Sequence, residues 1–103
     1  MTPQKFRRLA LGMPEAVEGS HMGHPDFRVG KKVFATLGYP DSKSGMVKLN
    51  ADQQAMLVSA EPEVFRPANG AWGRRGSTLV NLEKLDEQTA ESALRMAWAN
   101  VAG

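Results

Sequence analysis

The stretch at residues 26–37, DFRVGKKVFATL, limits what this chain can fold into more than any other segment. Two runs rich in β-branched and aromatic residues flank Gly30–Lys31. A glycine at the first position of such a two-residue break is typical of a type II′ β-hairpin turn. This turn would place Phe27 opposite Phe34 as an aromatic cross-strand pair. The chain is therefore expected to contain an antiparallel sheet.

The other patterns add helices and further strands around this hairpin. The last helix is the clearest, because its apolar residues recur at i, i+3, i+4 and i+7 along one face. Thr2 and Asn50 stand where N-caps of the first two helices are expected. Helices are predicted at residues 3–13, 51–60 and 86–101, and strands within residues 18–49 and at residues 77–82.

This order of elements predicts one α+β domain over residues 1–103. We expect two layers, with an antiparallel sheet of about five strands and three helices packed mainly on one side. A hydrophobic content of 42% can fill such a core. The absence of cysteine excludes disulfides and thiolate sites and fits a cytoplasmic protein. No apolar run approaches the ~18 residues of a membrane span, so no membrane association is expected.

Charge is unevenly distributed along the chain. Residues 1–75 hold 11 basic and 7 acidic side chains, whereas residues 76–103 hold 2 and 4. Arg28, Lys31 and Lys32 lie in the predicted hairpin. A basic hairpin tip is also a common solubility and edge-protection device, so this cluster alone does not define a site.

A second basic cluster lies in GAWGRRG, residues 70–76, which we predict to be an irregular loop. If Arg74 and Arg75 shared a surface with the hairpin, the combined patch could contact several phosphates. Trp72 could then stack on a base of a single strand. The interpretation that we favour for Trp72 is structural, as a plug at the edge of the core.

His21 and His24 are the two histidines of the chain. Gly23 and Pro25 argue against a helix that would bring them together, and in a single strand they would point to opposite faces. We therefore expect no metal site and interpret them as structural histidines, with a ligand or phosphate contact as the alternative. Ser20 beside His21 does not define a nucleophile and its base, and no G-x-S-x-G motif is present, so we expect neither an enzyme nor a cofactor.

Several segments together make the chain resemble the MmcQ/YjbR family of small bacterial proteins. They are EGSHMGHPDFRVGKKVFATL (18–37), VKL and DQQ within 47–54, EPEVFRP (61–67), GAWGRRG (70–76) and the closing helix around ALRMAWANVA (93–102). The resemblance implies a fold similar to that of CyaY and the frataxins. Members of this family are commonly labelled DNA-binding proteins, so the resemblance also implies DNA binding. The acidic iron-binding surface of frataxins is not expected, because the first helix carries Lys5, Arg7 and Arg8 and no carboxylate before Glu15.

Two functional hypotheses follow. The first is a non-enzymatic binding protein for DNA or another anionic partner, using Arg28, Lys31 and Lys32 together with the loop at 70–76. The second is a protein-interaction or small-ligand module with a cleft lined by His21, His24 and Trp72. The sequence does not determine the oligomeric state, for which we favour a monomer.

Overall fold

The computed structural model describes residues 1–102 and contains a six-stranded sheet with four α-helices. In chain order the elements are α1 (Pro3–Leu11), β1 (Val17–His21), β2 (His24–Val29), β3 (Lys32–Leu37), β4 (Ser44–Lys48), α2 (Ala51–Ala60), β5 (Phe65–Pro67), α3 (Gly70–Arg74), β6 (Ser77–Asn81), the 3-10 helix η1 (Leu82–Lys84) and α4 (Glu87–Ala102). No helix within residues 1–102 is long and apolar enough to cross a membrane.

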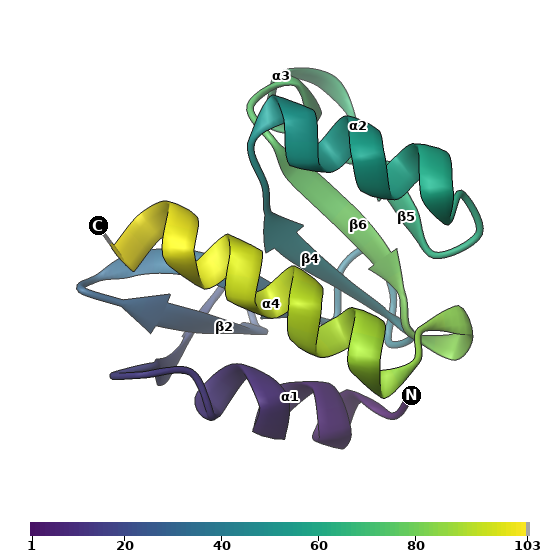
Figure 1. Cartoon of the computed structure of the whole chain (residues 1–103). Helices are drawn as coiled ribbons and strands as arrows, with labels where there is room; N and C mark the ends of the chain where they lie inside the picture. Colours follow the sequence, from purple (N-terminus) through teal and green to yellow (C-terminus); the bar gives the residue numbers. More distant parts are fainter. Residues whose placement is uncertain (103) are drawn as a thin grey trace.

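The sheet is antiparallel throughout, with the strand order β1-β2-β3-β4-β6-β5. Helices α1, α2 and α4 lie on one of its faces (Figure 1). We call the other face the open face. Side-chain alternation along the strands assigns to it Val17, Gly19, His21, His24, Asp26, Arg28, Thr36, Met46, Lys48, Arg66 and Leu79. The predicted α+β class, with helices mainly on one side, is confirmed.

The core lies between the sheet and the helices. Ala93, Leu94 and Ala97 of α4 are at most 2% exposed, so the predicted apolar face of the last helix is the buried one. All four phenylalanines are at most 1% exposed. Burial at this level stabilises each large side chain by about 2 kcal/mol relative to an exposed position, which makes this layer the main source of stability.

The first two helices begin at the predicted caps. The Thr2 side chain accepts a hydrogen bond from the Lys5 amide. Asn50 and Gln53 form the reciprocal pair of bonds of a capping box. Helix α1 ends at Leu11, two residues earlier than predicted, and Gly12 forms its C-cap.

The β2–β3 hairpin exists, but its turn is not the predicted type II′. Gly30 has φ +57° and Lys31 has φ +71°. Two successive positive φ angles are the signature of a type I′ turn, whereas a type II′ turn has only one. The twist of a type I′ turn matches that of the flanking strands, which offsets the cost of a left-handed conformation at Lys31.

The predicted pairing of Phe27 with Phe34 is wrong. Phe27 lies opposite Ala35, because the register between β2 and β3 shifts beside it. Phe34 is the extra residue of this β-bulge, and both Phe34 and Ala35 are fully buried in the core. The bulge thus places two consecutive side chains of β3 among apolar neighbours.

The interpretation of His21 and His24 as residues of one strand is also wrong. The chain reverses between them at Met22 and Gly23, which have φ +51° and +80°. His21 ends β1, His24 begins β2, and the two residues are directly opposite each other on the open face. The prediction failed because a Met-Gly turn is a much weaker signal than Asn-Gly or Gly-Lys.

Residues 61–76 hold more regular structure than predicted. Residues 65–67 form the edge strand β5, and residues 70–74 form the short helix α3, where an irregular loop was expected. These two elements account for the sixth strand and the fourth helix. The strand predicted at residues 77–82 is β6 (Ser77–Asn81), which pairs with β4 and β5.

Candidate nucleic-acid interface

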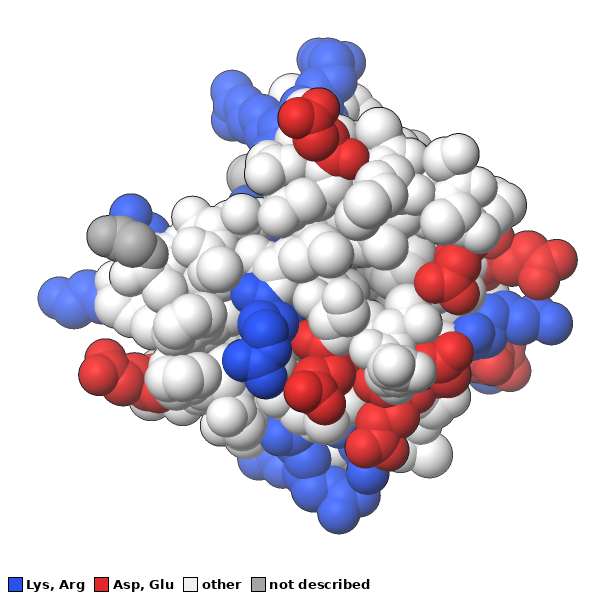
Figure 2. Space-filling view, in the orientation of Figure 1, with Lys and Arg blue, Asp and Glu red and all other residues white. Residues whose placement is uncertain are grey.

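The topology brings the two predicted basic segments to the same end of the sheet. Strand β3 begins there, β4 ends there and β6 begins there, because neighbouring strands are antiparallel. Figure 2 shows Lys and Arg at the upper, left and bottom margins and in the middle of the helix-covered face, and it shows most acidic side chains at the lower right, with others at the top and left. We call this end of the sheet the basic end and define it by Lys31, Lys32, Lys48, Trp72, Arg74 and Arg75.

Helix α3 supplies two of these side chains, Trp72 and Arg74, and its C-cap residue supplies a third, Arg75. The position of α3 depends on two close approaches of the backbone. A Cβ at Gly73 would lie 1.8 Å from the Ala68 carbonyl oxygen, and one at Gly76 would lie 1.7 Å from that of Leu49. Neither distance is compatible with any side chain. These two glycines of GAWGRRG therefore serve the packing of the chain against itself.

A side chain of α2 ties α3 to the sheet. Gln54 Nε2 donates to the Gly73 carbonyl oxygen at 3.0 Å and to Thr78 Oγ1 at 3.0 Å. Thr78 Oγ1 in turn donates to the Gly76 carbonyl oxygen at 3.0 Å. The backbone under the outward-facing residues of α3 is thus held by hydrogen bonds that are partly or fully buried.

Trp72 is 64% exposed, so the predicted role as a plug of the core is wrong. Lys48 Nζ lies 5.5 Å from the centre of the Trp72 ring, within the range of a cation–π contact. Arg74 and Arg75 are exposed. Asp52, in the first turn of α2, is the acidic residue closest in sequence to Lys48. The result is an indole held on an anchored helix and flanked by cations.

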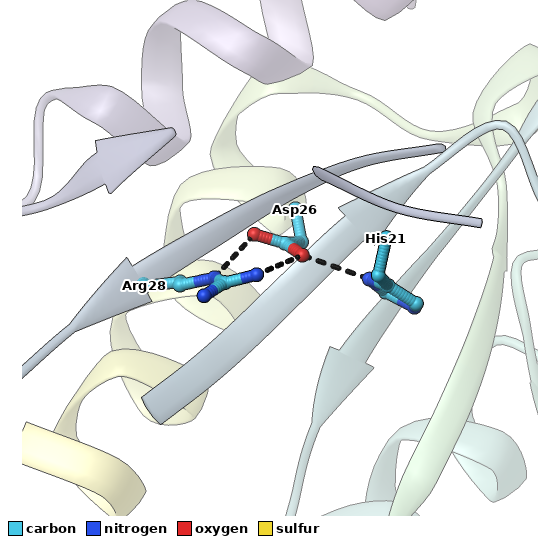
Figure 3. A network of polar contacts seen from close by, with 3 residues as sticks. All are labelled: His21, Asp26 and Arg28. Atoms are coloured by element: carbon cyan, nitrogen blue, oxygen red, sulfur yellow. Dashed lines mark hydrogen bonds and ion pairs between the residues drawn. The ribbon is translucent and has the colours of Figure 1, made fainter. Parts of the chain in front are cut away.

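Arg28 is engaged with the protein's own carboxylate (Figure 3). Its Nε donates to Asp26 Oδ1 at 2.7 Å and its Nη2 donates to Asp26 Oδ2 at 2.9 Å. His21 Nδ1 lies 2.8 Å from Asp26 Oδ2. Hydrogen bonds from the Arg28 guanidinium hold the pKa of the Asp26 carboxyl below its usual value, although burial opposes this. The Asp26 carboxylate in turn raises the pKa of Arg28.

The two histidines lie at the opposite end of the sheet from Trp72. His24 begins β2 and its ring meets that of Tyr39 edge-on, with centroids 6.0 Å apart. Along the strand direction His24 and Lys48 are separated by four residues, or about 13 Å. A single cleft lined by His21, His24 and Trp72 is therefore not formed. Residues 1–102 contain no group of three or more His, Cys, Asp or Glu that could hold a metal ion.

Two residues of interest were not singled out in the sequence. Lys48 alternates with the buried Val47 and Leu49, so its place on the other face of a strand could be inferred from the MVKLN pattern. Its contact with Trp72 could not, because 24 positions separate them. Tyr39 lies in the β3–β4 loop and is 60% exposed, and a loop aromatic carries no periodicity that would indicate its exposure.

A shallow pocket of about 330 Å³ lies at the end opposite to the basic end. It is formed by the β3–β4 loop, the segment before β5 and the end of β6, and it mixes charges of both signs. Asp41, at its rim, accepts hydrogen bonds from the Lys43 amide and the Ser44 hydroxyl, which lower the pKa of Asp41. The lining includes Asp41, Lys43, Glu63, Arg66, Leu79 and Glu83.

A family model described as YjbR matches residues 11–100. The crystal structure of Deinococcus radiodurans protein DR2400, which carries a DUF419 domain, superposes with a TM-score of 0.81. The match covers 97% of this chain and 78% of that one at 17% identity, so it shows a shared fold. No curated protein matches the sequence.

Proposed function

The chain belongs to the YjbR family, and from this premise we propose that it is a non-enzymatic, cytoplasmic, monomeric binding protein that contacts nucleic acid through the basic end. The single observation that carries the proposal is the exposed Trp72, anchored through α3 with Lys48 against its ring and followed in the chain by the exposed Arg74 and Arg75. An exposed aromatic ring among cations suits a partner that offers both phosphates and flat bases.

The hairpin lysines extend the positive surface. Lys31 and Lys32 are exposed at the same end of the sheet as α3. Phosphates held by these cations would release condensed counterions, so the affinity should fall steeply with salt. Arg28 contributes less than the sequence suggested, because Asp26 already occupies two of its nitrogens.

The proposal is tested by fluorescence anisotropy with a labelled oligonucleotide at several salt concentrations. Replacing Arg74 and Arg75 by alanine should weaken binding, and should reduce the slope of log K against log salt by about 1.4 for single strands, since each lost phosphate contact contributes ~0.7. The matched control replaces Lys43 and Lys84, two exposed lysines of the opposite end, and changes the net charge equally. Binding that is absent at low salt, or that both double variants weaken equally, contradicts the proposal.

A second candidate function is a small-ligand or protein-interaction module that uses the pocket of about 330 Å³. Its volume is at the lower end of the range for small-molecule sites. The lining carries the cations Lys43 and Arg66 together with the carboxylates Asp41 and Glu63, so it suits a ligand with charges of both signs. A thermal-shift screen with zwitterionic metabolites should then raise Tm in a way that Arg66→Ala abolishes, and a screen without hits excludes this candidate.

A further inference from the structure

Among residues 1–102, two Trp or Tyr side chains are exposed, and the residues that they contact lie on the same face. The four phenylalanines are buried, and Trp98 is partly buried with its indole nitrogen donating to the Pro14 carbonyl oxygen at 2.9 Å. Trp72 is 64% exposed and Tyr39 is 60% exposed. Trp72 contacts Lys48 and Tyr39 contacts His24, and both contacted residues belong to the open face.

The residues that these two rings contact are spaced as a short stretch of extended polymer would require. Lys48 and His24 differ by four residues along the strands and by two strands across the sheet. This corresponds to about 13 Å in one direction and about 10 Å in the other, or a diagonal of roughly 16 Å. The two residues that the rings contact thus lie near opposite corners of the middle of the open face.

The surface between the rings is suited to a negatively charged chain. Lys48 and Arg28 both point to the open face, and the Arg28 side chain is 35% exposed with donors that Asp26 does not use. Asp26 is the only carboxylate of strands β2, β3 and β4, and it is fully buried under its partners. A phosphate on this path would therefore meet cations and no exposed carboxylate from these strands.

The Tyr39 ring stands on a loop that is held in place. Asp41 Oδ1 accepts hydrogen bonds from the Lys43 amide at 2.9 Å and from the Ser44 hydroxyl at 2.9 Å. The Gly38 amide donates to the Ser44 carbonyl oxygen at 3.0 Å. The entropy lost when a ligand settles on the loop is smaller for a loop ordered in advance.

We propose that the open face binds single-stranded nucleic acid, with unpaired bases stacked on Trp72 and Tyr39 and the intervening backbone on Lys48 and Arg28. This inference rests on the proposed function and narrows its substrate class. Base faces are accessible in a single strand and are covered by neighbouring bases in a duplex, so only a single strand can use both rings. This path offers only the two cations Lys48 and Arg28, so a strand bound on it would gain much of its affinity from base stacking.

The test compares a single-stranded oligonucleotide of roughly ten nucleotides, a length within the range of single-strand sites, with the corresponding duplex. Tyr39→Ala and Trp72→Ala should each weaken single-strand binding by about 5- to 100-fold, the loss expected for one stacked base. Tyr39→Phe should retain the affinity, because the ring remains. Met56→Ala, which removes a side chain that is 51% exposed on α2, is the matched control and should leave binding unchanged. The three side chains that these variants change are all more than half exposed, so the folded state should survive each change, as circular dichroism can verify.

The outcomes separate this inference from the proposed function. The single-strand inference is contradicted if the duplex binds as tightly as the single strand. It is also contradicted if Tyr39→Ala has no effect while the Arg74 and Arg75 double variant weakens binding. In either case the proposed function, nucleic-acid binding at the basic end, is still supported. If no nucleic acid binds at low salt, both the single-strand inference and the proposed function are contradicted. If a proline-rich peptide binds instead and Tyr39→Ala abolishes it, the open face is a protein-binding surface and the inference is overturned.

Discussion

At the scale of single residues, the buried carboxylate of Asp26 organises the open face. It is fully buried on the face of the sheet opposite α1, α2 and α4, covered by Arg28 and His21 from two strands. Gly19 makes room for this arrangement, because a Cβ there would lie 2.9 Å from Asp26 Oδ1 and 3.0 Å from Arg28 Nε. The network links β1 to β2 by side chains in addition to the backbone ladder.

Asp26→Asn should therefore destabilise the fold at neutral pH by about 2 kcal/mol, less than for a fully buried pair because Arg28 still reaches solvent. The pKa of Asp26 is lower in the folded state than its ordinary 3.8. The ionised carboxylate therefore stabilises the fold above about pH 4, and this contribution is lost as the pH falls through the folded-state pKa. Urea denaturation should show a difference between wild type and Asp26→Asn at pH 7 that shrinks at pH 3. An equal difference at both values would exclude an electrostatic role.

At the scale of elements, α3 shows how a five-residue helix can hold an exposed ring. Its own hydrogen bonds are too few to make it stable alone, since nucleation of an isolated helix is unfavourable. Stability comes from the Gln54 hydrogen bonds and from the close packing of Gly73 and Gly76 against neighbouring backbone. The element is thus part of the scaffold, while Trp72 remains free.

Gly76→Ala should be strongly destabilising, by about 3 kcal/mol or more, because it combines a positive φ with a steric clash. The matched control is Gly30→Ala in the type I′ turn, where φ is also positive but nothing lies within 4 Å of the new Cβ. It should cost only about 1 kcal/mol, the strain of the left-handed conformation. Chemical denaturation of both variants gives their free energies of unfolding, and the difference between the two losses is the contribution of the steric clash. Equal losses of stability would show that α3 does not depend on the close approach of Gly76 to Leu49.

The elements also show what the sequence could predict. Helices α2 and α4 and the β2–β3 hairpin follow from local signals, namely a capping box, an apolar face of period 3.6 and a Gly-Lys turn. The bulge at Phe34 does not follow from local signals. The predicted register and the observed register of β2 and β3 both bury a phenylalanine, and only packing against the helices decides between them. The exposure of Trp72 and the hairpin between His21 and His24 likewise depend on tertiary contacts, which leave no pattern in the neighbouring residues.

At the scale of the whole molecule, charge is arranged along the strand direction. The basic end collects the β2–β3 turn, the end of β4 and α3, and two carboxylates, Asp52 and Glu18, lie near it at the starts of α2 and β1. The opposite end collects the segment before β5, η1 and the start of α4, where Glu61, Glu63, Glu83 and Glu87 are found together with Lys43 and Lys84. Such polarity should orient an approaching polyanion before contact. Raising the ionic strength should therefore slow association as well as weaken binding.

The measurement that tests the central claim most directly is an NMR titration of the two indole N–H signals with a single-stranded oligonucleotide at low salt. Trp72 lies at the basic end and is exposed, whereas the Trp98 indole is partly buried and hydrogen-bonded to Pro14. We expect the Trp72 signal to shift in proportion to occupancy and the Trp98 signal to stay in place, as an internal control. An unmoved Trp72 signal under saturating oligonucleotide would contradict the assignment of the basic end as the binding surface.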